Sequence, residues 1–341
     1  MTRSAGSYCG RFAPSPTGPL HFGSLLAALA SYLDARAHGG RWLLRVEDID
    51  PPREQPGASR AIIDSLRAHG LDWDGPVCHQ HTRGDAYDAA LDALERKGLL
   101  RRCYCPRRVL GPDGACGGRC GGEGEGPAAL RVRVDAAWPT AFEDRFQGPV
   151  AATALPEDFV VRRRDGLYAY QLAVVVDDYA QGITDVVRGA DLLSVTPRQR
   201  YLQACLGYPS PRYAHCPVLL GGDGRKLSKQ NHAPPLEDGN AVANLRRALE
   251  LLAQPPAPAA AAPAPTAAPA PWRGCRSPTR TFSAPTACAP AAPRACSTTS
   301  CRPTAPPRSN ASPPRAPSPS ARPTWTSSPW ARLTSPVFMA P

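Results

Sequence analysis

Two lysines stand close together in the stretch RKLSKQNHAP, residues 225–234. They are Lys226 and Lys229, and only one further lysine occurs among the 40 basic residues of the chain. A lysine ammonium is a compact charge on a flexible stem, whereas arginine presents a rigid planar fork. The ammonium can therefore follow phosphate groups whose geometry changes during a reaction. With the glycine turn GGDG before it, the stretch predicts a mobile phosphate-binding loop; the alternative is a solvated basic turn.

A second stretch, RFAPSPTGPLHFGSL at residues 11–25, has the form of a strand, a loop and the start of a helix. His21 and Gly23 fall where the helix begins. The first turn of a helix exposes free N–H groups and the positive end of its dipole, so phosphate is a natural ligand there. Gly23 lets a nucleotide approach closely, and His21 can donate to a phosphoryl oxygen. Taken alone, the stretch is also compatible with an ordinary strand-to-helix turn.

A third stretch, CYCPRRVLGPDGACGGRC, groups four of the twelve cysteines. Cys103, Cys105, Cys116 and Cys120 have the spacing C-x-C-x10-C-x3-C among glycines. Four thiolates form the closed tetrahedral shell of a structural zinc site. The alternative, unpaired core cysteines, fits a glycine-rich polar neighbourhood poorly, and the spacing therefore predicts Zn²⁺.

The elements around these stretches predict a nucleotide-binding α/β fold. SYCGRFA and RWLLRVED have the pattern of strands, and Leu25, Leu29 and Leu33 share one face of a helix between them. This order favours a parallel sheet with right-handed crossovers. Thr196 and Pro197 have the pattern of an N-cap and a first helical residue. We therefore predict a first catalytic half at 1–98, a small zinc-binding insertion at 99–150 and a second half at 151–254.

Residues 255–341 differ in composition from the rest of the chain. They hold 22 of the 41 prolines and nine arginines, with no lysine and no acidic residue. Such a segment buries too little apolar surface to offset its ordering entropy, so we expect a disordered tail. It is either a basic RNA-binding arm or the product of a frameshift in a GC-rich gene, and we favour the frameshift on composition. Resequencing the gene distinguishes the two.

The overall charge of +11 comes mainly from this tail. Residues 1–254 contain 31 basic and 29 acidic residues, a net of +2, so the pI says little about the partner. The N-terminus lacks the apolar core of a signal peptide, and no run approaches the roughly 18 apolar residues of a membrane span. We therefore expect a cytoplasmic protein without a membrane partner, in which reduced cysteines bind metal.

The two phosphate-binding stretches resemble the HIGH and KMSKS elements of class I aminoacyl-tRNA synthetases, with HFGS and KLSKQ in their places. Five ordered stretches between about residue 7 and about residue 253 are similar to the glutamyl-queuosine tRNA(Asp) synthetase family, short relatives of the glutamyl-tRNA synthetase catalytic domain. They are GRFAPSPTGPLHFGSL, RVEDIDPPR, RRDGLYAYQLAVVVDD, VVRGADLL and KLSKQNHAP. The resemblance implies a class I Rossmann-like sheet split by a zinc-binding insertion, in a monomer.

The resemblance also implies a ligase reaction. Glutamate and ATP, with Mg²⁺, would give glutamyl-adenylate, and the glutamyl group would pass to the cyclopentene diol of queuosine in the anticodon of tRNA(Asp). By similarity, His21 and Lys229 are catalytic, and ATP binds at His21, Gly23, Lys226 and Lys229. Glutamate would bind at Arg11, Ala13, Ser15, Glu47, Tyr170 and Arg188. Two cations and one anion suit a ligand with two carboxylates and one ammonium. In this family the third zinc ligand can be a tyrosine; here that position is Cys116.

Two other functions compete with this prediction. A glutamyl-tRNA synthetase that charges a tRNA 3′ end would carry a large helical domain after the KMSKS loop, and only about 25 residues precede the proline-rich tail here. A non-catalytic zinc- and RNA-binding relic is the other. Glutamate-dependent ATP–pyrophosphate exchange separates the relic from the enzyme, and the acceptor nucleoside rests on the resemblance alone.

Overall fold

The first half of the fold is a parallel three-stranded sheet. The computed structural model describes residues 7–111, 114–116, 123–155, 158–220, 234–253 and 337–339. The sheet order is β1-β2-β3, from β1 (Cys9–Phe12), β2 (Arg41–Val46) and β3 (Cys78–His79). Helix α1 (Phe22–Ala37) connects β1 to β2, while η1 (Pro51–Arg53) and α2 (Ala58–Ala68) precede β3. The two strands and the helix predicted between residues 7 and 46 are confirmed.

Glycine is required where α1 turns back into β2. Gly39 has φ +59°, a left-handed conformation that suits glycine. A Cβ on Gly40 would lie 2.5 Å from the Tyr8 carbonyl oxygen, so no larger residue fits. The pair ends the helix and lets β2 run close beside the residue before β1.

The second half is a four-stranded sheet of order β7-β6-β10-β9, in which β6, β10 and β9 are parallel and β7 is an antiparallel edge. The strands are β6 (Phe142–Asp144), β7 (Gly148–Val150), β9 (Asp185–Gly189) and β10 (Arg212–Cys216). Helix α4 (Tyr170–Ala180) leads into β9, and η4 (Ala190–Val195) and α5 (Thr196–Leu206) lead into β10. Thr184 N donates to Cys9 O at 2.9 Å, which joins β1 to the β9 side.

The cysteine-rich region belongs to a third, antiparallel sheet. Its order is β4-β5-β8, from β4 (Leu100–Cys103), β5 (Ala129–Arg133) and β8 (Asp158–Arg162). The short η3 (Arg107–Val109) follows β4, and η2 (Gln80–Arg83) with α3 (Gly84–Arg96) precedes it. β8 therefore pairs with strands of the predicted insertion, while β6 and β7 pair with the catalytic half.

The described C-terminal elements are β11 (Val218–Leu220), η6 (Asp238–Asn240), α6 (Ala241–Leu251) and β12 (Val337–Met339). Most of the predicted disordered tail lies outside the described residues. Its three described residues differ from that prediction, because β12 pairs in parallel with β11. Valine and phenylalanine are residue types that favour strands, in contrast to the proline-rich sequence before them.

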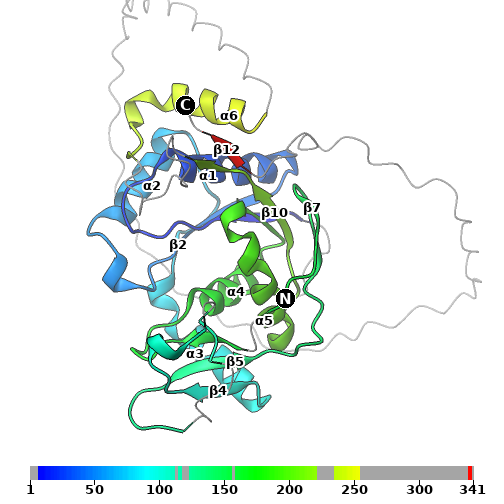
Figure 1. Ribbon diagram of the computed structural model, residues 1–341. Coiled ribbons are helices and arrows are strands. Elements are labelled where there is room, and N and C mark those ends of the chain that lie inside the picture. Colours follow the sequence, from blue (N-terminus) through cyan, green and yellow to red (C-terminus); the bar gives the residue numbers. More distant parts are fainter. Residues whose placement is uncertain are drawn as a thin grey trace, which may run out of the picture. The chain divides into compact units, whose positions relative to one another are not determined.

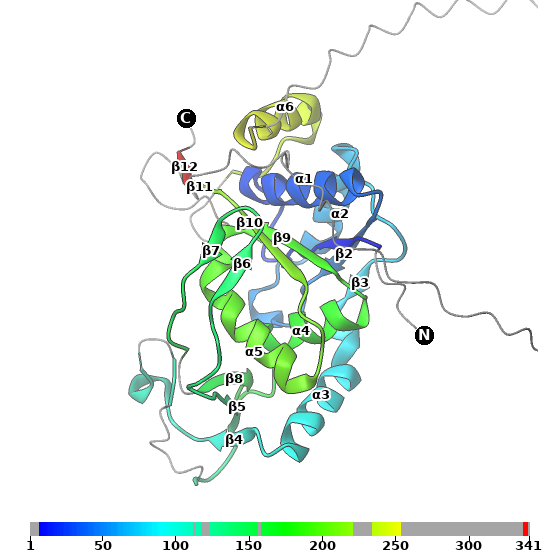
Figure 2. The ribbon, with the colours of Figure 1, turned by 90° about the vertical axis from the view of Figure 1, so that its right-hand side faces the viewer.

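Helices cover both sides of the parallel strands (Figures 1 and 2). Alternate residues of β1, β2, β9 and β10 point to α1, α2 and α6, where Leu25, Leu44 and Ala214 are buried in the largest cluster. Leu43, Val186 and Tyr213 point to the other side. A further cluster packs α3, α4 and α5 against β5 and β8. In the part of the chain that the structure describes, no helix is long and apolar enough to cross a membrane.

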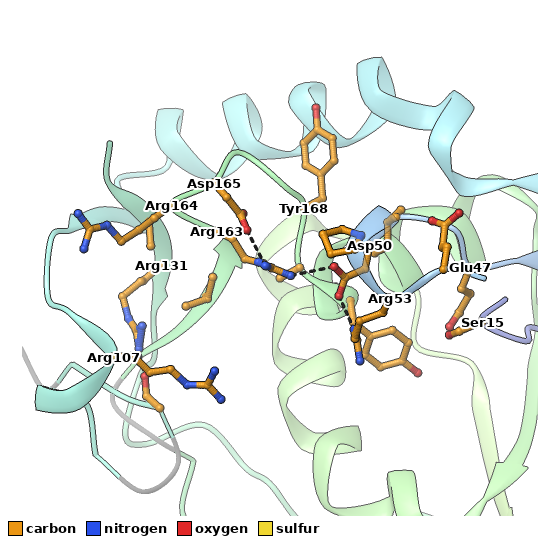
Figure 3. A pocket seen from close by; sticks show the side chains of 18 of the residues that line it. Ser15, Glu47, Asp50, Arg53, Arg107, Arg131, Arg163, Arg164, Asp165 and Tyr168 are labelled. Carbon is orange, nitrogen blue, oxygen red and sulfur yellow. Dashed lines mark hydrogen bonds and ion pairs between the residues drawn. The ribbon is translucent and has the colours of Figure 1, made fainter. Parts of the chain in front are cut away.

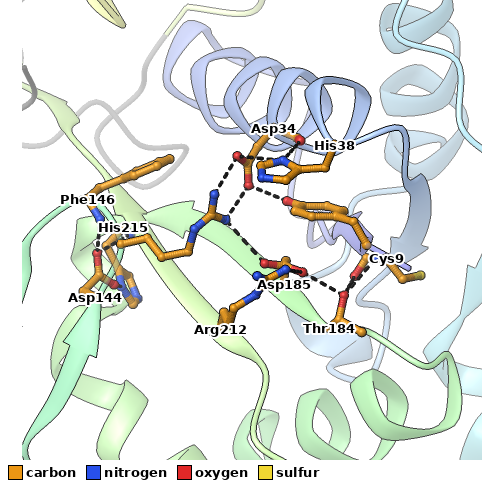
Figure 4. A network of polar contacts seen from close by, with 11 residues as sticks. Cys9, Asp34, His38, Asp144, Phe146, Thr184, Asp185, Arg212 and His215 are labelled. Carbon is orange, nitrogen blue, oxygen red and sulfur yellow. Dashed lines mark hydrogen bonds and ion pairs between the residues drawn. The ribbon is translucent and has the colours of Figure 1, made fainter. Parts of the chain in front are cut away.

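A buried polar network ties α1 to the second sheet (Figure 4). Arg145 donates to both Asp34 oxygens, at 2.7 and 3.0 Å, and its Nη1 lies 3.4 Å from Asp185. The Tyr8 hydroxyl donates to Asp34 at 2.5 Å. Arg212 donates to Asp185 at 2.8 Å. Because removing one partner would leave a buried charge uncompensated, the network fixes how the two halves of the parallel fold meet.

The start of α5 differs by one residue from the prediction. Val195 is the N-cap, and Thr196 is the first helical residue with Pro197 after it. The Thr196 hydroxyl does not cap the helix because it makes other bonds: it donates to Leu192 O at 3.0 Å and accepts from Arg188 at 2.8 Å. The side chain holds an arginine of the site instead of capping the helix.

Candidate active site

A cavity of about 450 Å³ opens at the carboxyl ends of the parallel strands. All six residues that the sequence predicts for glutamate line it. The lining is Arg11, Phe12, Ala13, Ser15, Ala27, Glu47, Arg53, Tyr170, Val187, Arg188, Gly189 and Leu192. Open α/β sheets bind ligands at the carboxyl ends of their strands, at the point where the connections from two neighbouring strands go to opposite sides. The structure thus brings together six residues assigned to glutamate that lie up to 177 positions apart, from Arg11 to Arg188.

Each lining side chain is delivered by the end of an element. Arg11 is in β1, and Ala13 and Ser15 follow that strand; Glu47 is the first residue after β2. Arg188 lies near the end of β9, and Tyr170 is the first residue of α4. Glu47 N donates to Pro14 O at 2.9 Å, which holds the two loops against each other.

Arg11 is oriented by a buried aspartate. Its Nε donates to Asp178 Oδ1 at 3.1 Å, and Arg45 Nη2 donates to the same oxygen at 2.7 Å. Arg11 is 3% exposed, and Arg45 is fully buried. Burial works against ionisation of Asp178, but the two guanidinium groups outweigh it and keep the pKa of this carboxyl below its usual value. Arg11 thus uses Nε for this pair, and the residue also lines the cavity.

Glu47 carries the anionic character of the cavity. It lies 3.8 Å from Arg45 Nη2. Burial raises the pKa of Glu47 to about 7, although Arg45 and Arg11 pull in the opposite direction. Desolvation thus dominates over two neighbouring positive charges. A ligand ammonium beside Glu47 would replace the lost hydration and favour the carboxylate.

Arg188 is held at all three guanidinium nitrogens. Nη1 donates to Gln199 at 2.8 Å, Nη2 to Thr196 at 2.8 Å and Nε to His215 Nε2 at 3.1 Å. His215 in turn lies 2.6 Å from Asp144 through Nδ1. Figure 4 shows His215 beside Asp144. The arginine, which lines the cavity, is therefore fixed before any ligand arrives.

A larger cavity of about 870 Å³ adjoins the first and shares Ser15, Glu47, Arg53 and Tyr170 with it. It extends toward the cysteine-rich region (Figure 3). Five arginines line it: Arg53, Arg107, Arg131, Arg163 and Arg164. Asp50 orients two of them, accepting from Arg53 at 2.6 Å and from Arg163 at 3.1 Å. Four acidic residues also line it, so its walls carry both signs of charge: Glu47, Asp50, Glu54 and Asp165.

His21 is the N-cap of α1, and Gly23 lies in the first turn. His21 Nδ1 accepts from Ser24 N at 3.2 Å. The residues after the predicted lysine loop return to this point, since His21 bridges to Pro235 and Leu236 N donates to Leu20 O at 2.9 Å. Lys226 and Lys229 lie outside the described residues, so their placement in the site remains a prediction.

Three of the four predicted metal ligands meet in space. The thiol sulfurs of Cys103, Cys105 and Cys116 lie within 4.8 Å of one another, and Cys105 Sγ is 3.4 Å from Cys116 Sγ. None of the three is in a disulfide. Zinc–sulfur bonds are about 2.3 Å long, so three thiolates at these separations fit one ion. Cys120 lies outside the described residues. The cluster could therefore hold a metal ion, and zinc is the identity that its sulfur ligands favour.

The sequence did not identify several residues that orient the site. Asp178 and Arg45 hold Arg11, and His215 with Asp144 holds Arg188. A signal existed for two of them: Asp178 ends the apolar run LAVVVDD, and His215 interrupts the apolar strand YAHCPVLL. A polar residue in such a run is buried only with a partner. The partners themselves come from distant segments.

Comparison with known proteins agrees with this geometry. Residues 9–111 and 119–242 match the family of tRNA synthetases class I (E and Q), catalytic domain. A Pseudomonas fluorescens protein named glutamyl-Q tRNA(Asp) synthetase is 55% identical over 262 residues, which are 75% of this chain and 88% of that protein. A Pseudomonas aeruginosa protein of the same name is also 55% identical, covering 76% of this chain and 90% of the relative.

A solved structure shares the fold. The glutamate tRNA ligase of Elizabethkingia meningosepticum, in complex with its amino acid, superposes with a TM-score of 0.59 and 27% identity over 66% of this chain. The chain spans about half of that protein, 52% of its length. The residues of the cavity, the parallel strands that present them and the extent of these matches lead to one conclusion: the chain belongs to the class I tRNA synthetase catalytic-domain family for E and Q, and within it to the glutamyl-Q tRNA(Asp) synthetases.

Proposed function

We propose that this chain activates glutamate with ATP and transfers the glutamyl group to queuosine in the anticodon of tRNA(Asp). The observation that carries the proposal is the single cavity of about 450 Å³, whose lining includes two arginines, one glutamate and one tyrosine. The names of the relatives, which are 55% identical to this chain, supply the acceptor. We also propose that the enzyme acts as a monomer in the cytoplasm, where tRNA is present.

The charges of the cavity match those of free glutamate. Arg11 and Arg188, both oriented by buried partners, are assigned to the two carboxylates. Glu47 is assigned to the ammonium, and the Tyr170 hydroxyl, Ser15 and Ala13 complete the contacts. Charge-assisted hydrogen bonds to fixed arginines orient a ligand strongly, and fixed groups lose little entropy on binding.

ATP is assigned to the start of α1 and the lysine loop. Gly23 would face the nucleotide, while His21, Lys226 and Lys229 would bind its phosphates together with Mg²⁺. A carboxylate oxygen of glutamate attacks the α-phosphorus, the bond to the β-phosphate oxygen breaks, and pyrophosphate leaves. The attacking carboxylate is already ionised, so this step needs positioning and charge stabilisation and no general base.

The larger cavity is assigned to the acceptor nucleotide. It shares Glu47 and Tyr170 with the smaller one, so a nucleoside there would lie next to an activated glutamate. A diol oxygen attacks the carbonyl carbon of the adenylate, and AMP leaves. Four of the arginines, Arg53, Arg107, Arg163 and Arg164, are at least partly exposed and could contact phosphates of the anticodon loop, whereas Arg131 is buried against Asp158.

A structural zinc ion is assigned to Cys103, Cys105, Cys116 and Cys120. The first three form the cluster already described, beside the arginine-lined cavity. The ion would tie β4 to the loop that ends at Cys116 and would thereby stabilise this wall of the cavity. We expect one zinc equivalent to be lost in Cys105→Ser, with a lower melting temperature. An unchanged zinc content would contradict the assignment, and Cys205→Ser, outside the cluster, is the control.

Transfer of labelled glutamate tests the proposed function. We expect label to enter tRNA(Asp) that carries queuosine and not the same tRNA with guanosine at that position. Label that enters the unmodified tRNA, and is released as a 3′-terminal adenosine ester, would instead show an enzyme that charges the 3′ end. If the protein forms the adenylate but neither tRNA becomes labelled, the acceptor assignment is wrong and the assignment of the activation step stands.

A further inference from the structure

Asp48, His79 and His81 form a second cluster of metal-binding side chains, separate from the cysteines. It is one of two such groups among the described residues. β2 and β3 lie side by side (Figure 2) and run in parallel. Their register pairs Val46 with His79. Asp48 follows the end of β2, and His81 lies in η2 directly after β3. The three side chains therefore meet at the carboxyl edge of the sheet.

The geometry converges on one carboxylate oxygen. His81 Nδ1 lies 2.7 Å and His79 Nδ1 lies 3.1 Å from Asp48 Oδ2. The other oxygen, Oδ1, accepts from His81 N at 2.9 Å, which fixes the plane of the carboxylate. Asp48 is 5% exposed, whereas the His81 side chain is 61% exposed and leaves a path for an ion from solvent.

We propose that Asp48, His79 and His81 bind a divalent transition-metal ion of the zinc class. In a tetrahedral site with bonds of about 2.0–2.1 Å, ligand atoms are roughly 3.3 Å apart, so the separations of 2.7 and 3.1 Å need only a small expansion. Imidazole and carboxylate ligands suit Zn²⁺, Co²⁺ and Ni²⁺. One carboxylate and two imidazoles supply three ligands, which leaves a fourth position for water.

An ion bound at this position would affect the neighbouring cavity. Asp48 directly follows Glu47, which lines the proposed glutamate site. An ion that clamps the ends of β2 and β3 would restrict the backbone that carries Glu47. We therefore expect the bound ion to raise the melting temperature of the protein and to alter the affinity for glutamate.

The test counts metal equivalents in the full chain under reducing conditions. Cobalt chloride is titrated into wild type and into the double variant His79→Gln/His81→Gln, and bound cobalt is measured by mass spectrometry and by absorption. We expect wild type to bind one equivalent more than the double variant. The spectrum of that extra equivalent should lack sulfur-to-cobalt charge transfer, because no thiolate is among its ligands. Other cysteine sites contribute equally to both proteins and cancel in the difference.

Two further variants separate a metal role from a folding role. His38→Gln is the matched control, because His38 also lies near an aspartate, with Nδ1 3.6 Å from Asp34, but has no second histidine beside it. We expect it to retain the extra equivalent. Asp48→Asn, which removes the carboxylate shared by both histidines, should bind that equivalent more weakly, by about tenfold or more. Circular dichroism establishes that each variant is folded. Equal cobalt binding by folded wild type and double variant, or an extra equivalent with a thiolate spectrum, would overturn the proposal.

Discussion

Arg188 Nε lies 3.1 Å from His215 Nε2, and the imidazole must be the acceptor because a guanidinium can only donate. Nδ1 of His215 therefore carries the hydrogen and donates to Asp144 at 2.6 Å. Burial is the main reason that the pKa of His215 is lowered, and the positive charge of Arg188 acts in the same direction. A neutral histidine of fixed tautomer thus orients an arginine assigned to glutamate.

Replacing this acceptor should weaken glutamate binding without abolishing the reaction. His215→Asn keeps a donor toward Asp144 but ends short of Arg188, whereas His215→Gln can place an amide oxygen near the lost Nε2. Loss of a hydrogen bond to a charged group costs about 1.5–3 kcal/mol. We expect KM for glutamate to rise about tenfold or more in His215→Asn, with kcat changed much less, and to be partly restored in His215→Gln. Steady-state pyrophosphate exchange gives both constants. A fall in kcat alone would contradict the positioning role.

The buried histidine should also make stability depend on pH. Burial and the positive charge of Arg188 lower the pKa of His215. They outweigh the Asp144 and Asp191 carboxylates, which favour the charged imidazole. A lowered pKa means that the unfolded chain binds the proton first, so this contribution to stability is complete above about pH 6.5 and is lost as pH falls. Urea unfolding between pH 7.5 and 5 should show a shallower decline in His215→Gln than in wild type. Parallel curves would show that His215 does not contribute.

Asp178 should be essential for stability, since it neutralises two buried cations. Its Oδ1 accepts from Arg11 at 3.1 Å and from Arg45 at 2.7 Å. Removing one partner of a buried ion pair costs about 3–5 kcal/mol. We expect Asp178→Asn to lower the free energy of unfolding in urea by roughly this amount.

Asp165→Asn is the matched control for that loss. Asp165 accepts from Arg163 at 2.5 Å, but both side chains are more than 40% exposed. Exposed pairs contribute at most about 1 kcal/mol, so this variant should unfold almost as wild type does. Equal losses in the two variants would show that burial of the Asp178 cluster is not the cause.

Lys229→Arg tests whether the predicted loop needs an ammonium group. The substitution keeps the charge but replaces a flexible stem by a rigid fork, so we expect adenylate formation to slow about tenfold or more. Rapid-quench measurement of ATP consumption in a single turnover isolates this step. Lys97→Arg is the control, because Lys97 Nζ donates to Cys205 O at 2.6 Å, far along the chain from the loop. A rate equal to wild type in Lys229→Arg would show that charge alone is sufficient.

The local parts of the fold could be predicted from the sequence. β1, α1 and β2 follow from alternating and helical apolar spacing, and the resemblance placed six residues that line one cavity. The supporting contacts could not be predicted, because they join distant segments: Arg11 to Asp178 and Arg188 to His215. Periodicity carries no information about such pairs. The metal cluster of Asp48 and His79 was missed for the same reason, since strand register creates it.

Glutamate-dependent ATP–pyrophosphate exchange in the absence of tRNA tests the account most directly. The cavity with Arg11, Glu47 and Arg188 is preformed among the described residues, so activation should not require the acceptor. We predict exchange with glutamate, much less exchange with aspartate, whose side chain is one methylene shorter, and a rise of KM for glutamate in Glu47→Gln. A folded, zinc-loaded protein that shows no glutamate-dependent exchange would contradict the account.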